Sequence, residues 1–245
     1  MNHPVVSEAE WLAARRRHLL RENDLRRQLD DLRRQRRELP WMAVIKAYSF
    51  FGAQGRQTLV DLFGNCSQLV VQHFMFAPEW EEGCVGCSFQ ADHVDAAFVH
   101  LQHHDVAFAA VARAPWPKLD AFRRRMGWKF HWVSSYGSDF NRDFSVSFQP
   151  QELTDGPVFY NFEDQYLASE EMPGISVFLR DSDGVIYRTY SAYGRGTELL
   201  VGAYSYLDLT PKGRNETGPA FDLTDWVRLH DRYELPVAPV CCYRR

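Results

Sequence analysis

The spacing of apolar positions divides the chain into a charged helical start, a mixed middle and a polar end. Residues 7 to 39 carry a thin seam of leucines among charged side chains, which predicts one long helix. Ser7 and Glu10 form a capping box that marks the start of this helix, and Pro40 marks its end. We therefore expect an N-terminal charged helix over 1–40.

The middle of the chain alternates between strand-like runs and helical patterns. Residues 68–76 are apolar on both faces, as in a central strand covered by helices, and 105–112 form a second buried strand. The helical pattern between them, from about Cys84 to His104, completes a β-α-β unit with a right-handed crossover. Around this unit we predict a hairpin over 46–51 and 57–59, a helix over 117–126 and a short strand over 131–134.

A second hairpin follows later in the chain. Residues 175–180 and 185–190 are strand-like, and Asp181-Ser-Asp-Gly184 between them has the composition of a turn. A helical stretch is predicted at about 196–207. Beyond it we expect a loop over 208–219, which is rich in Gly, Pro, Asn and Thr, and a last helix over 222–233.

The order of these elements predicts the fold class. A β-α-β unit followed by a helix, a β-hairpin and a helix is the connectivity of thioredoxin, an α/β fold with a central mixed sheet flanked by helices. We expect this thioredoxin-like domain over 41–207, after the helical extension 1–40 and before a loop, a short helix and a tail over 208–245. Open α/β sheets place their sites at the carboxyl ends of strands, so chemistry is expected just after residue 76.

The composition narrows the class of protein. The chain has 245 residues, of which 45% are apolar and 24% charged, as in an ordinary globular protein. Its net charge of −4 argues against a general nucleic-acid binder. No run approaches the roughly 18–20 apolar residues that span a bilayer, and residues 1–8 lack the features of a signal peptide. We expect a cytoplasmic protein with neither a membrane nor a nucleic-acid partner.

Cys84 and Cys87 directly precede the predicted helix and form a C-x-x-C motif. Two thiols at this spacing can close into a disulfide, and the free N–H groups of a helix start favour a thiolate. Cys84 is expected to be the attacking thiol, and Cys87, one turn deeper, is expected to resolve the mixed disulfide. Glu79, Glu81 and Glu82 lie close in sequence and should oppose thiolate formation.

A metal site is an alternative use of the same thiols. Thiolates combined with imidazole suit copper(I) or zinc. His73, on the strand before the motif, and His131, on a neighbouring strand, are the histidines that could join Cys84 and Cys87. His100 is excluded, because it lies roughly 24 Å from Cys84 along a straight helix.

The other cysteines are Cys66, Cys241 and Cys242. Cys241 and Cys242 are adjacent and can bridge only through a strained ring, so we expect free thiols in the tail. An exchange of electrons between this tail and the C-x-x-C pair is the alternative.

Short motifs are spread over most of the chain. They are Glu10-Trp-Leu-Ala-Ala-Arg15, His73-Phe-Met-Phe76, Glu82-Gly-Cys-Val-Gly-Cys-Ser-Phe89, Arg124-Arg-Met-Gly-Trp128, Trp132-Val-Ser-Ser135, Gly137-Ser-Asp-Phe-Asn-Arg-Asp-Phe144 and Gly174-Ile-Ser-Val-Phe-Leu179. Together they resemble a bacterial family known as domain of unknown function 899, whose members are predicted to be thioredoxin-like dithiol-disulfide oxidoreductases. The resemblance implies a fold and a redox class, without a substrate. Val85 departs from the family, which usually carries proline after the first cysteine.

Asp139-Phe-Asn-Arg-Asp143 is a polar run that we predict to be a loop. Loops near strand ends often carry function. Arg142 is expected to bind an anionic group of the substrate or to pair with Glu79 or Glu82. Asp139 is a second candidate for substrate binding.

The strand that begins near Ile175 is the place where thioredoxins dock substrate. They carry a cis-proline just before this strand, facing the disulfide. The corresponding position here falls on Ile175 or Ser176, and Pro173 lies too early for it. Ser176 is therefore a candidate substrate contact.

The leading prediction is a thiol-disulfide oxidoreductase that uses Cys84 and Cys87, with a protein or small-molecule disulfide as substrate and no resident cofactor. Peroxide reduction is less favoured, because peroxidases of this fold generally show Pro-x-x-x-Thr-x-x-Cys, whereas Glu81 lies three residues before Cys84 and Pro78 six before it. The alternatives are a copper- or zinc-binding thioredoxin-like protein and a non-catalytic scaffold that forms a homodimer through the N-terminal helix.

Overall fold

The structure is a computed structural model, and it describes residues 3–214, 216 and 226–234. Internal contacts divide the chain into two units, Met1–Trp41 and Met42–Arg245. The first unit is built on α1 (Glu8–Arg37), which begins where the sequence predicts. The Ser7 hydroxyl accepts a hydrogen bond from the Glu10 N–H, and the Glu10 carboxylate accepts one from the Ser7 N–H, so the capping box is formed.

Charged side chains along α1 pair with one another. None of its residues is buried, so its own side-chain pairs and its cap must supply much of its stability. The pairs three residues apart are Asp24–Arg27, Asp30–Arg33 and Asp31–Arg34. No helix among the described residues is long and apolar enough to cross a membrane.

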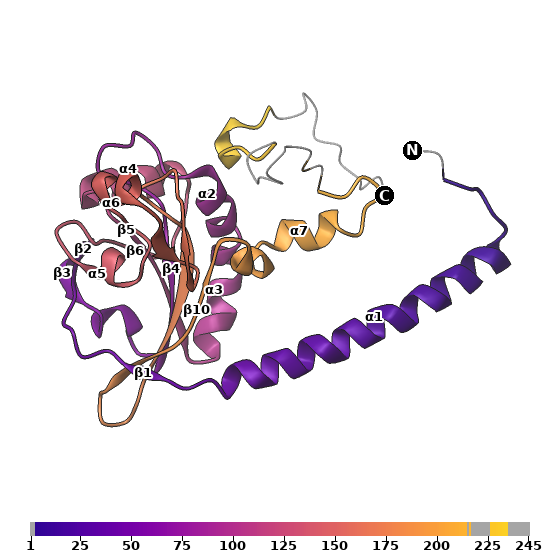
Figure 1. Cartoon of the computed structure of the whole chain (residues 1–245), viewed down its shortest axis with the longest axis horizontal. Coiled ribbons are helices and arrows are strands. Elements are labelled where there is room, and N and C mark those ends of the chain that lie inside the picture. Colours follow the sequence, from indigo (N-terminus) through magenta and orange to yellow (C-terminus); the bar gives the residue numbers. More distant parts are fainter. Residues whose placement is uncertain (1–2, 215, 217–225, 235–245) are drawn as a thin grey trace, which may run out of the picture. The chain divides into compact units, whose positions relative to one another are not determined.

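The second unit is built on an eight-stranded mixed sheet with the strand order β1-β10-β9-β4-β5-β6-β2-β3 (Figure 1). β4 is parallel to β5 and β5 to β6, whereas the other neighbours are antiparallel. The strands are β1 (Met42–Ala43), β2 (Ser49–Gly52), β3 (Gly55–Thr58), β4 (Gln68–His73), β5 (Val106–Ala112), β6 (His131–Ser134), β9 (Gly174–Arg180) and β10 (Ile186–Tyr193). A separate hairpin consists of β7 (Val158–Tyr160) and β8 (Glu163–Gln165).

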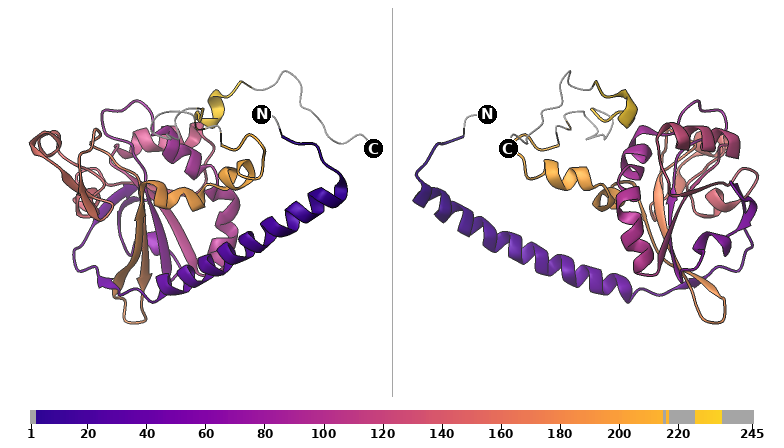
Figure 2. Two further views of the ribbon diagram at one scale, coloured as in Figure 1. Left: turned by 45° about the vertical axis from the view of Figure 1, so that its right-hand side comes forward. Right: turned by 180° about the vertical axis from the view of Figure 1, so that it is seen from behind.

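Helices cover both faces of this sheet (Figures 1 and 2). One face packs against α2 (Val85–Ala91), α3 (Val94–His103) and α4 (Trp116–Arg125). The other packs against the 3₁₀ helix Asp61–Phe63 and α5 (Phe140–Asp143). The remaining helices are α6 (Pro150–Asp155), α7 (Gly202–Leu207) and the 3₁₀ helices Gly194–Leu200 and His230–Arg232.

The connectivity is the predicted one. β4 and β5 are joined by α2 and α3 in a β-α-β unit, α4 follows, and β9 and β10 form the second hairpin beside β4. The chain therefore has a thioredoxin-like α/β fold with an N-terminal helical extension, as the sequence predicts.

The helix predicted from about Cys84 to His104 is broken in two, which corrects the sequence prediction. The break falls at Asp92 and His93, whose side chains have partners elsewhere in the fold. The Asp92 carboxylate accepts a hydrogen bond of 2.7 Å from Trp128 Nε1, and His93 Nε2 accepts one of 3.0 Å from the Ala203 N–H. These contacts fix the two helices separately against the rest of the fold.

Four other predictions need smaller corrections. The run 139–143 is not a loop, because residues 140–143 form the single turn of α5. The strand predicted over 68–76 ends at His73. The helical stretch at 196–207 is a 3₁₀ helix followed by α7. The last helix, predicted over 222–233, is not formed in its described part: residues 226–229 are extended or in a turn, and only His230–Arg232 make a short 3₁₀ helix, while 222–225 lie outside the described residues.

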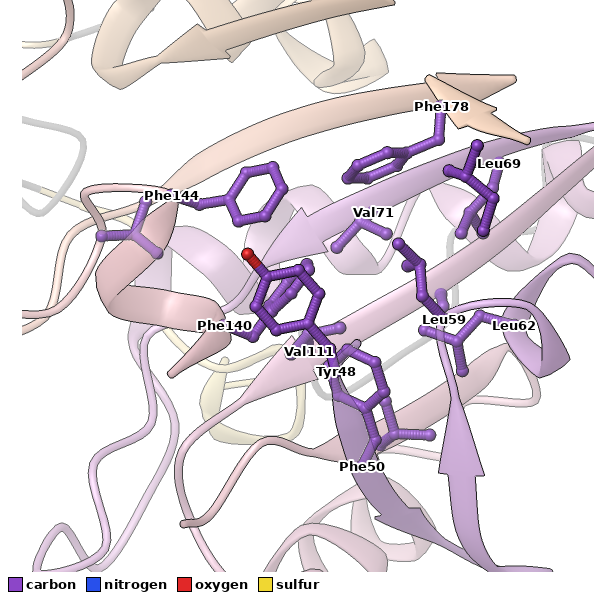
Figure 3. Packing of buried hydrophobic residues seen from close by; sticks show 14 of the residues in the cluster. Tyr48, Phe50, Leu59, Leu62, Leu69, Val71, Val111, Phe140, Phe144 and Phe178 are labelled. Atoms are coloured by element: carbon purple, nitrogen blue, oxygen red, sulfur yellow. The ribbon is translucent and has the colours of Figure 1, made fainter. Parts of the chain in front are cut away.

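The core on the α5 face is rich in aromatic rings (Figure 3). Alternate residues of β4 face it, including Val71 and His73, and Phe178 of β9 lies beside them. Phe140 is fully buried, and its ring centroid lies 5.0 Å from that of Phe50 and 4.5 Å from that of Phe144. The aromatic residues of 132–148 thus belong mainly to the core.

Phe140→Ala tests how much this cluster contributes. Loss of a fully buried ring should lower the free energy of unfolding by roughly 3–5 kcal/mol, through lost burial and the cavity left behind. Urea denaturation measures this change. Phe51→Ala is the matched control, because Phe51 is 46% exposed. Equal losses in the two variants would contradict this description of the core.

Candidate redox site

The segment that carries the cysteines leaves β4 and returns onto the end of the same strand. The Phe74 N–H donates to the Val111 carbonyl (2.8 Å), so the chain stays paired with β5 just beyond His73. The Cys84 N–H then donates to the Met75 carbonyl (3.0 Å). This bond fixes the start of α2 at the carboxyl end of β4, where the sequence places the site.

Cys84 and Cys87 are both thiols in the structure, and they differ in exposure. Cys84 is the N-cap residue of α2 and is half-buried, whereas Cys87 is only 3% exposed. The Met75 N–H also lies 3.5 Å from Cys87 Sγ and donates toward it. Cys84 is thus the more accessible thiol.

A hydrogen bond joins the thiols of Cys84 and Cys87. The pKa of Cys87 is raised, first by the hydrogen bond between its thiol and Cys84, and then by burial. Because the proton stays on Cys87, the Cys87 thiol donates the hydrogen bond to the sulfur of Cys84. A donor in this position stabilises a negative charge on the Cys84 sulfur. The arrangement therefore favours Cys84 as the thiolate and Cys87 as the thiol.

A buried polar network lies beneath the pair. Gln72 Nε2 donates to the Cys87 carbonyl (3.0 Å) and to Gln90 Oε1 (3.3 Å), and the Ser88 hydroxyl donates to the Cys84 carbonyl (2.8 Å). The two bonds from Gln72 tie α2 to the central strand, and the bond from Ser88 closes the first turn of the helix. Sequence reasoning missed Gln72, although a polar side chain in a strand predicted to be buried on both faces is a signal that could have found it.

Cations from α4 approach the acidic loop before Cys84. Lys118 Nζ donates to the carbonyls of Pro78 (2.7 Å) and Trp80 (2.8 Å). Arg125 Nη1 pairs with Glu82 at 2.5 Å. Of the three carboxylates that the sequence expects to oppose thiolate formation, Glu82 is therefore paired with a guanidinium, while Glu79 and Glu81 are exposed.

Glu171 is a buried carboxyl group that sequence reasoning also missed. It is 1% exposed, accepts a hydrogen bond of 2.7 Å from the Ser147 hydroxyl and pairs with Arg113 at 2.8 Å. Burial raises the pKa of Glu171 to about 7, although Arg113 and Ser147 oppose the rise. Its charge also helps to raise the pKa of Cys87. Nothing in the sequence distinguishes Glu171 from its neighbour Glu170.

The predicted substrate residues on α5 are engaged in ion pairs of their own. Asp139 pairs with Lys46 at 2.9 Å. Arg142 forms two bonds with Glu152, of 2.8 and 3.1 Å, and so pairs with neither of the carboxylates that the sequence suggested. Arg142 also lines an open pocket of about 550 Å³.

Ser176 does not line the thiol site, which corrects its predicted place. It is fully buried, and its hydroxyl lies 2.8 Å from His73 Nε2 and 2.9 Å from the Ser191 hydroxyl. Ser176 pairs with Val71 across the sheet, so it shares the α5 face, opposite the Gln72 side chain that contacts α2.

The proposed metal ligands are not gathered either. His73 faces the α5 side, with its ring 5.6 Å from that of Phe140, and burial lowers its pKa to about 3. His131 begins β6, at the end of that strand away from the thiols. No group of three or more His, Cys, Asp or Glu residues suited to hold a metal ion occurs in the part of the chain that the structure describes.

The other cysteines lie apart from the pair. Cys66 precedes β4, at the opposite end of that strand from Cys84, and burial raises the pKa of its thiol. Cys241 and Cys242 lie outside the described residues.

Comparison with known proteins identifies the family. A family described as "Bacterial protein of unknown function (DUF899)" matches residues 1–233. The chain belongs to the DUF899 family. The resemblance inferred from the sequence motifs is thereby confirmed. A search of curated proteins found no match.

Solved structures that resemble this DUF899 protein have low sequence identity to it. A mutant of Xylella fastidiosa PrxQ has 14% identity and a TM-score of 0.41, over 65% of this chain and 89% of that one. Peroxidoxin BcpB from Mycobacterium tuberculosis has 11% identity and a TM-score of 0.44, over 66% and 93%. Xanthomonas campestris peroxiredoxin Q has 14% identity and a TM-score of 0.39, over 67% and 99%.

Alkylation of the reduced protein should modify Cys84 before Cys87. Cys87 is buried and has a raised pKa, so its modification should be at least about tenfold slower. Timed reaction with iodoacetamide, followed by peptide mass spectrometry, measures both rates in one sample. Cys87 reacting first would contradict the roles that the geometry gives the two thiols.

Glu171→Gln should change how stability depends on pH. The folded state raises the pKa of this carboxyl from 4.5 to about 7 and so holds its proton more tightly than the unfolded chain does. Its stabilising contribution is complete below the unfolded pKa and is lost as the pH rises through the folded pKa. Between about pH 4 and 8, the free energy of unfolding of the wild type should therefore fall by roughly 2–3 kcal/mol relative to the variant.

Urea denaturation at several pH values measures this difference. Glu170→Gln is the matched control, since it removes a neighbouring carboxyl group that is not fully buried. Parallel pH profiles for the wild type and Glu171→Gln would contradict the burial of an ionisable group at this position.

Proposed function

We propose that the chain is a thiol-disulfide oxidoreductase in which Cys84 and Cys87 cycle between dithiol and disulfide. The observation that carries the proposal is the hydrogen-bonded pair itself, an accessible Cys84 at the start of α2 beside a buried Cys87 whose pKa is raised. Two cysteines that only stabilise the fold do not need to differ in exposure. In disulfide exchange, by contrast, the attacking thiol must be accessible to the substrate, whereas the resolving thiol can be buried next to it.

The proposed cycle has two exchange steps. The Cys84 thiolate attacks one sulfur of a disulfide R–S–S–R′, a Cys84–S–R bond forms, and R′–S⁻ leaves and takes up a proton. Cys87 then loses its proton and attacks the sulfur of Cys84, which forms the Cys84–Cys87 disulfide and releases R–S⁻. Two electrons pass from the protein to the substrate, and an external dithiol restores the starting state by the reverse exchange.

The partner in this reaction is a protein or small-molecule disulfide. The cycle needs only thiols, so a resident cofactor is not part of the proposal. A reducing compartment such as the cytoplasm would keep the pair in the dithiol form. A homodimer through α1 remains a prediction, since α1 keeps exposed leucines such as Leu20 and Leu25.

Cys87→Ser should trap the first half of the cycle. With an excess of glutathione disulfide, this variant should accumulate a stable mixed disulfide at Cys84, because the resolving thiol is missing. The wild type should instead form the Cys84–Cys87 disulfide, and Cys84→Ser should form adducts at least about tenfold more slowly. Intact-mass and peptide mass spectrometry distinguish these products.

Cys66→Ser is the control, because Cys66 lies at the far end of β4 and its loss should leave the wild-type pattern unchanged. A scaffold without redox chemistry predicts that Cys84→Ser changes nothing. Adducts that form equally fast in Cys87→Ser and in Cys84→Ser would overturn the proposal.

A further inference from the structure

The segment Trp226–Glu234, here called the C-terminal strap, packs against the helix that carries the cysteines. Leu229 is 2% exposed and lies in the same apolar cluster as Cys87. Val227 is buried in a second cluster with Phe89 of α2. The strap is thus part of the same packed unit as the thiol pair, although Leu229 and Cys87 lie far apart in the sequence.

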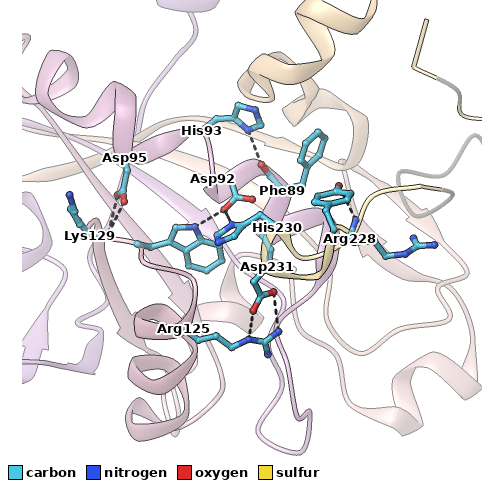
Figure 4. A network of polar contacts seen from close by, with 12 residues as sticks. Phe89, Asp92, His93, Asp95, Arg125, Lys129, Arg228, His230 and Asp231 are labelled. Carbon is cyan, nitrogen blue, oxygen red and sulfur yellow. Dashed lines mark hydrogen bonds and ion pairs between the residues drawn. The ribbon is translucent and has the colours of Figure 1, made fainter. Parts of the chain in front are cut away.

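Polar contacts from the strap reach the loop just before α2 and the C-terminal end of α2, and Figure 4 shows the one at the C-terminal end, between His230 and Asp92. At the C-terminal end, His230 Nδ1 lies 2.7 Å from the carboxylate of Asp92, the C-cap residue. At the N-terminal end, Arg232 Nη2 bonds Glu82 Oε1 at 2.5 Å, two residues before Cys84. The strap therefore contacts both the loop that leads into α2 and the residue that ends α2.

α4 completes the contact at the N-terminal end. Arg125 forms two bonds with Asp231 of the strap, of 2.7 and 3.1 Å, and pairs with the same Glu82 oxygen that Arg232 contacts. Glu82 therefore receives two guanidinium groups, one from α4 and one from the strap. Arg125 and Arg232 carry two positive charges, and Glu82 and Asp231 carry two negative charges. The cluster is therefore neutral, and its member Glu82 lies two residues before the attacking thiol in the sequence.

We propose that Arg125 and Arg232 are positioning residues of the redox site: together they hold Glu82 and offset its charge next to Cys84. The inference rests on the proposed function. An unpaired carboxylate at Glu82 would disfavour the Cys84 thiolate. The two arginines remove this opposition and anchor the loop that precedes α2, so the strap is needed for the chemistry as well as for packing.

Other charged groups face the same region and stay unchanged in the test. They are Glu79 and Glu81 on the loop itself, Cys87 on α2, Lys118 on α4, Asp231 on the strap, and Glu170 and Glu171 with Arg113 across the site. These groups are present in every variant below, but the loss of Arg125 also removes the partner of Asp231. A difference between variants therefore reports on the whole cluster of Glu82, Asp231 and the two arginines.

Two variants with opposite charge changes test the proposal. Arg125→Gln/Arg232→Gln leaves Glu82 and Asp231 without these guanidinium partners and should move the midpoint pH of Cys84 alkylation upward by about half to one unit. Glu82→Gln leaves the arginines in place and should move the midpoint downward by a similar amount. At a pH below the midpoint, these shifts correspond to Cys84 labelling that is about three- to tenfold slower in the double variant and about three- to tenfold faster in Glu82→Gln. Both shifts should shrink at high salt, because these side chains are partly exposed.

The readout is the rate of iodoacetamide labelling at Cys84 across a pH series, on the full reduced chain. Arg124→Gln is the matched control, because Arg124 is the neighbouring residue of α4, pairs with Asp120 and should leave the midpoint unchanged. Should the double variant fail to fold by circular dichroism, Arg232→Gln alone carries the test, with about half the shift.

Opposite shifts support the proposal. Shifts in the same direction, or no shift in either variant, overturn it, since a purely structural role has no reason to respond to the sign of the charge. Failure of the proposed function looks different: the wild type would then form no Cys84–Cys87 disulfide at all, whatever the labelling midpoints.

Discussion

The position of Cys84 depends on one constraint, the return of the chain onto the end of β4. The backbone hydrogen bond from the Cys84 N–H to the Met75 carbonyl closes this return. The bond from the Phe74 N–H to the Val111 carbonyl keeps the outgoing segment on the sheet. Because these bonds satisfy backbone groups that would otherwise be buried without partners, α2 can begin at a fixed place. The start of α2 in turn sets the positions at which Cys87 is buried, Gln72 bonds to the helix and the strap packs against it.

The electrostatics of the site follow from what surrounds this fixed helix. Cys87 is buried and keeps its proton toward Cys84, so the inner thiol supports charge on the outer one. The loop before the motif is acidic, but Glu82 is held between Arg125 and Arg232. α2 has only two turns, so its own dipole is smaller than the unbroken helix predicted from sequence would supply. Side chains from distant segments therefore influence the charge state of Cys84 more than the dipole of α2 does.

The sequence predicted the parts of the fold that depend on local pattern. The alternation in β9 and β10, the apolar run of β4 and the capping box at Ser7 each follow from neighbouring residues, and they agree with the structure. It failed where a side chain finds a partner outside its own helix or strand. The break at Asp92 depends on Trp128, and the partner of Arg142 is Glu152. Ser176 lies on the opposite face of the sheet from the thiols, since strand register alone decides that face.

The most direct measurement is the reduction potential of the Cys84–Cys87 pair in metal-free protein, by thiol trapping across a dithiothreitol series with mass-spectrometric readout. The account predicts one reversible two-electron transition, in the range of roughly −270 to −120 mV that working oxidoreductases occupy. Two thiols that stay reduced under every condition, or a disulfide that no dithiol concentration opens, would contradict a redox role for the site.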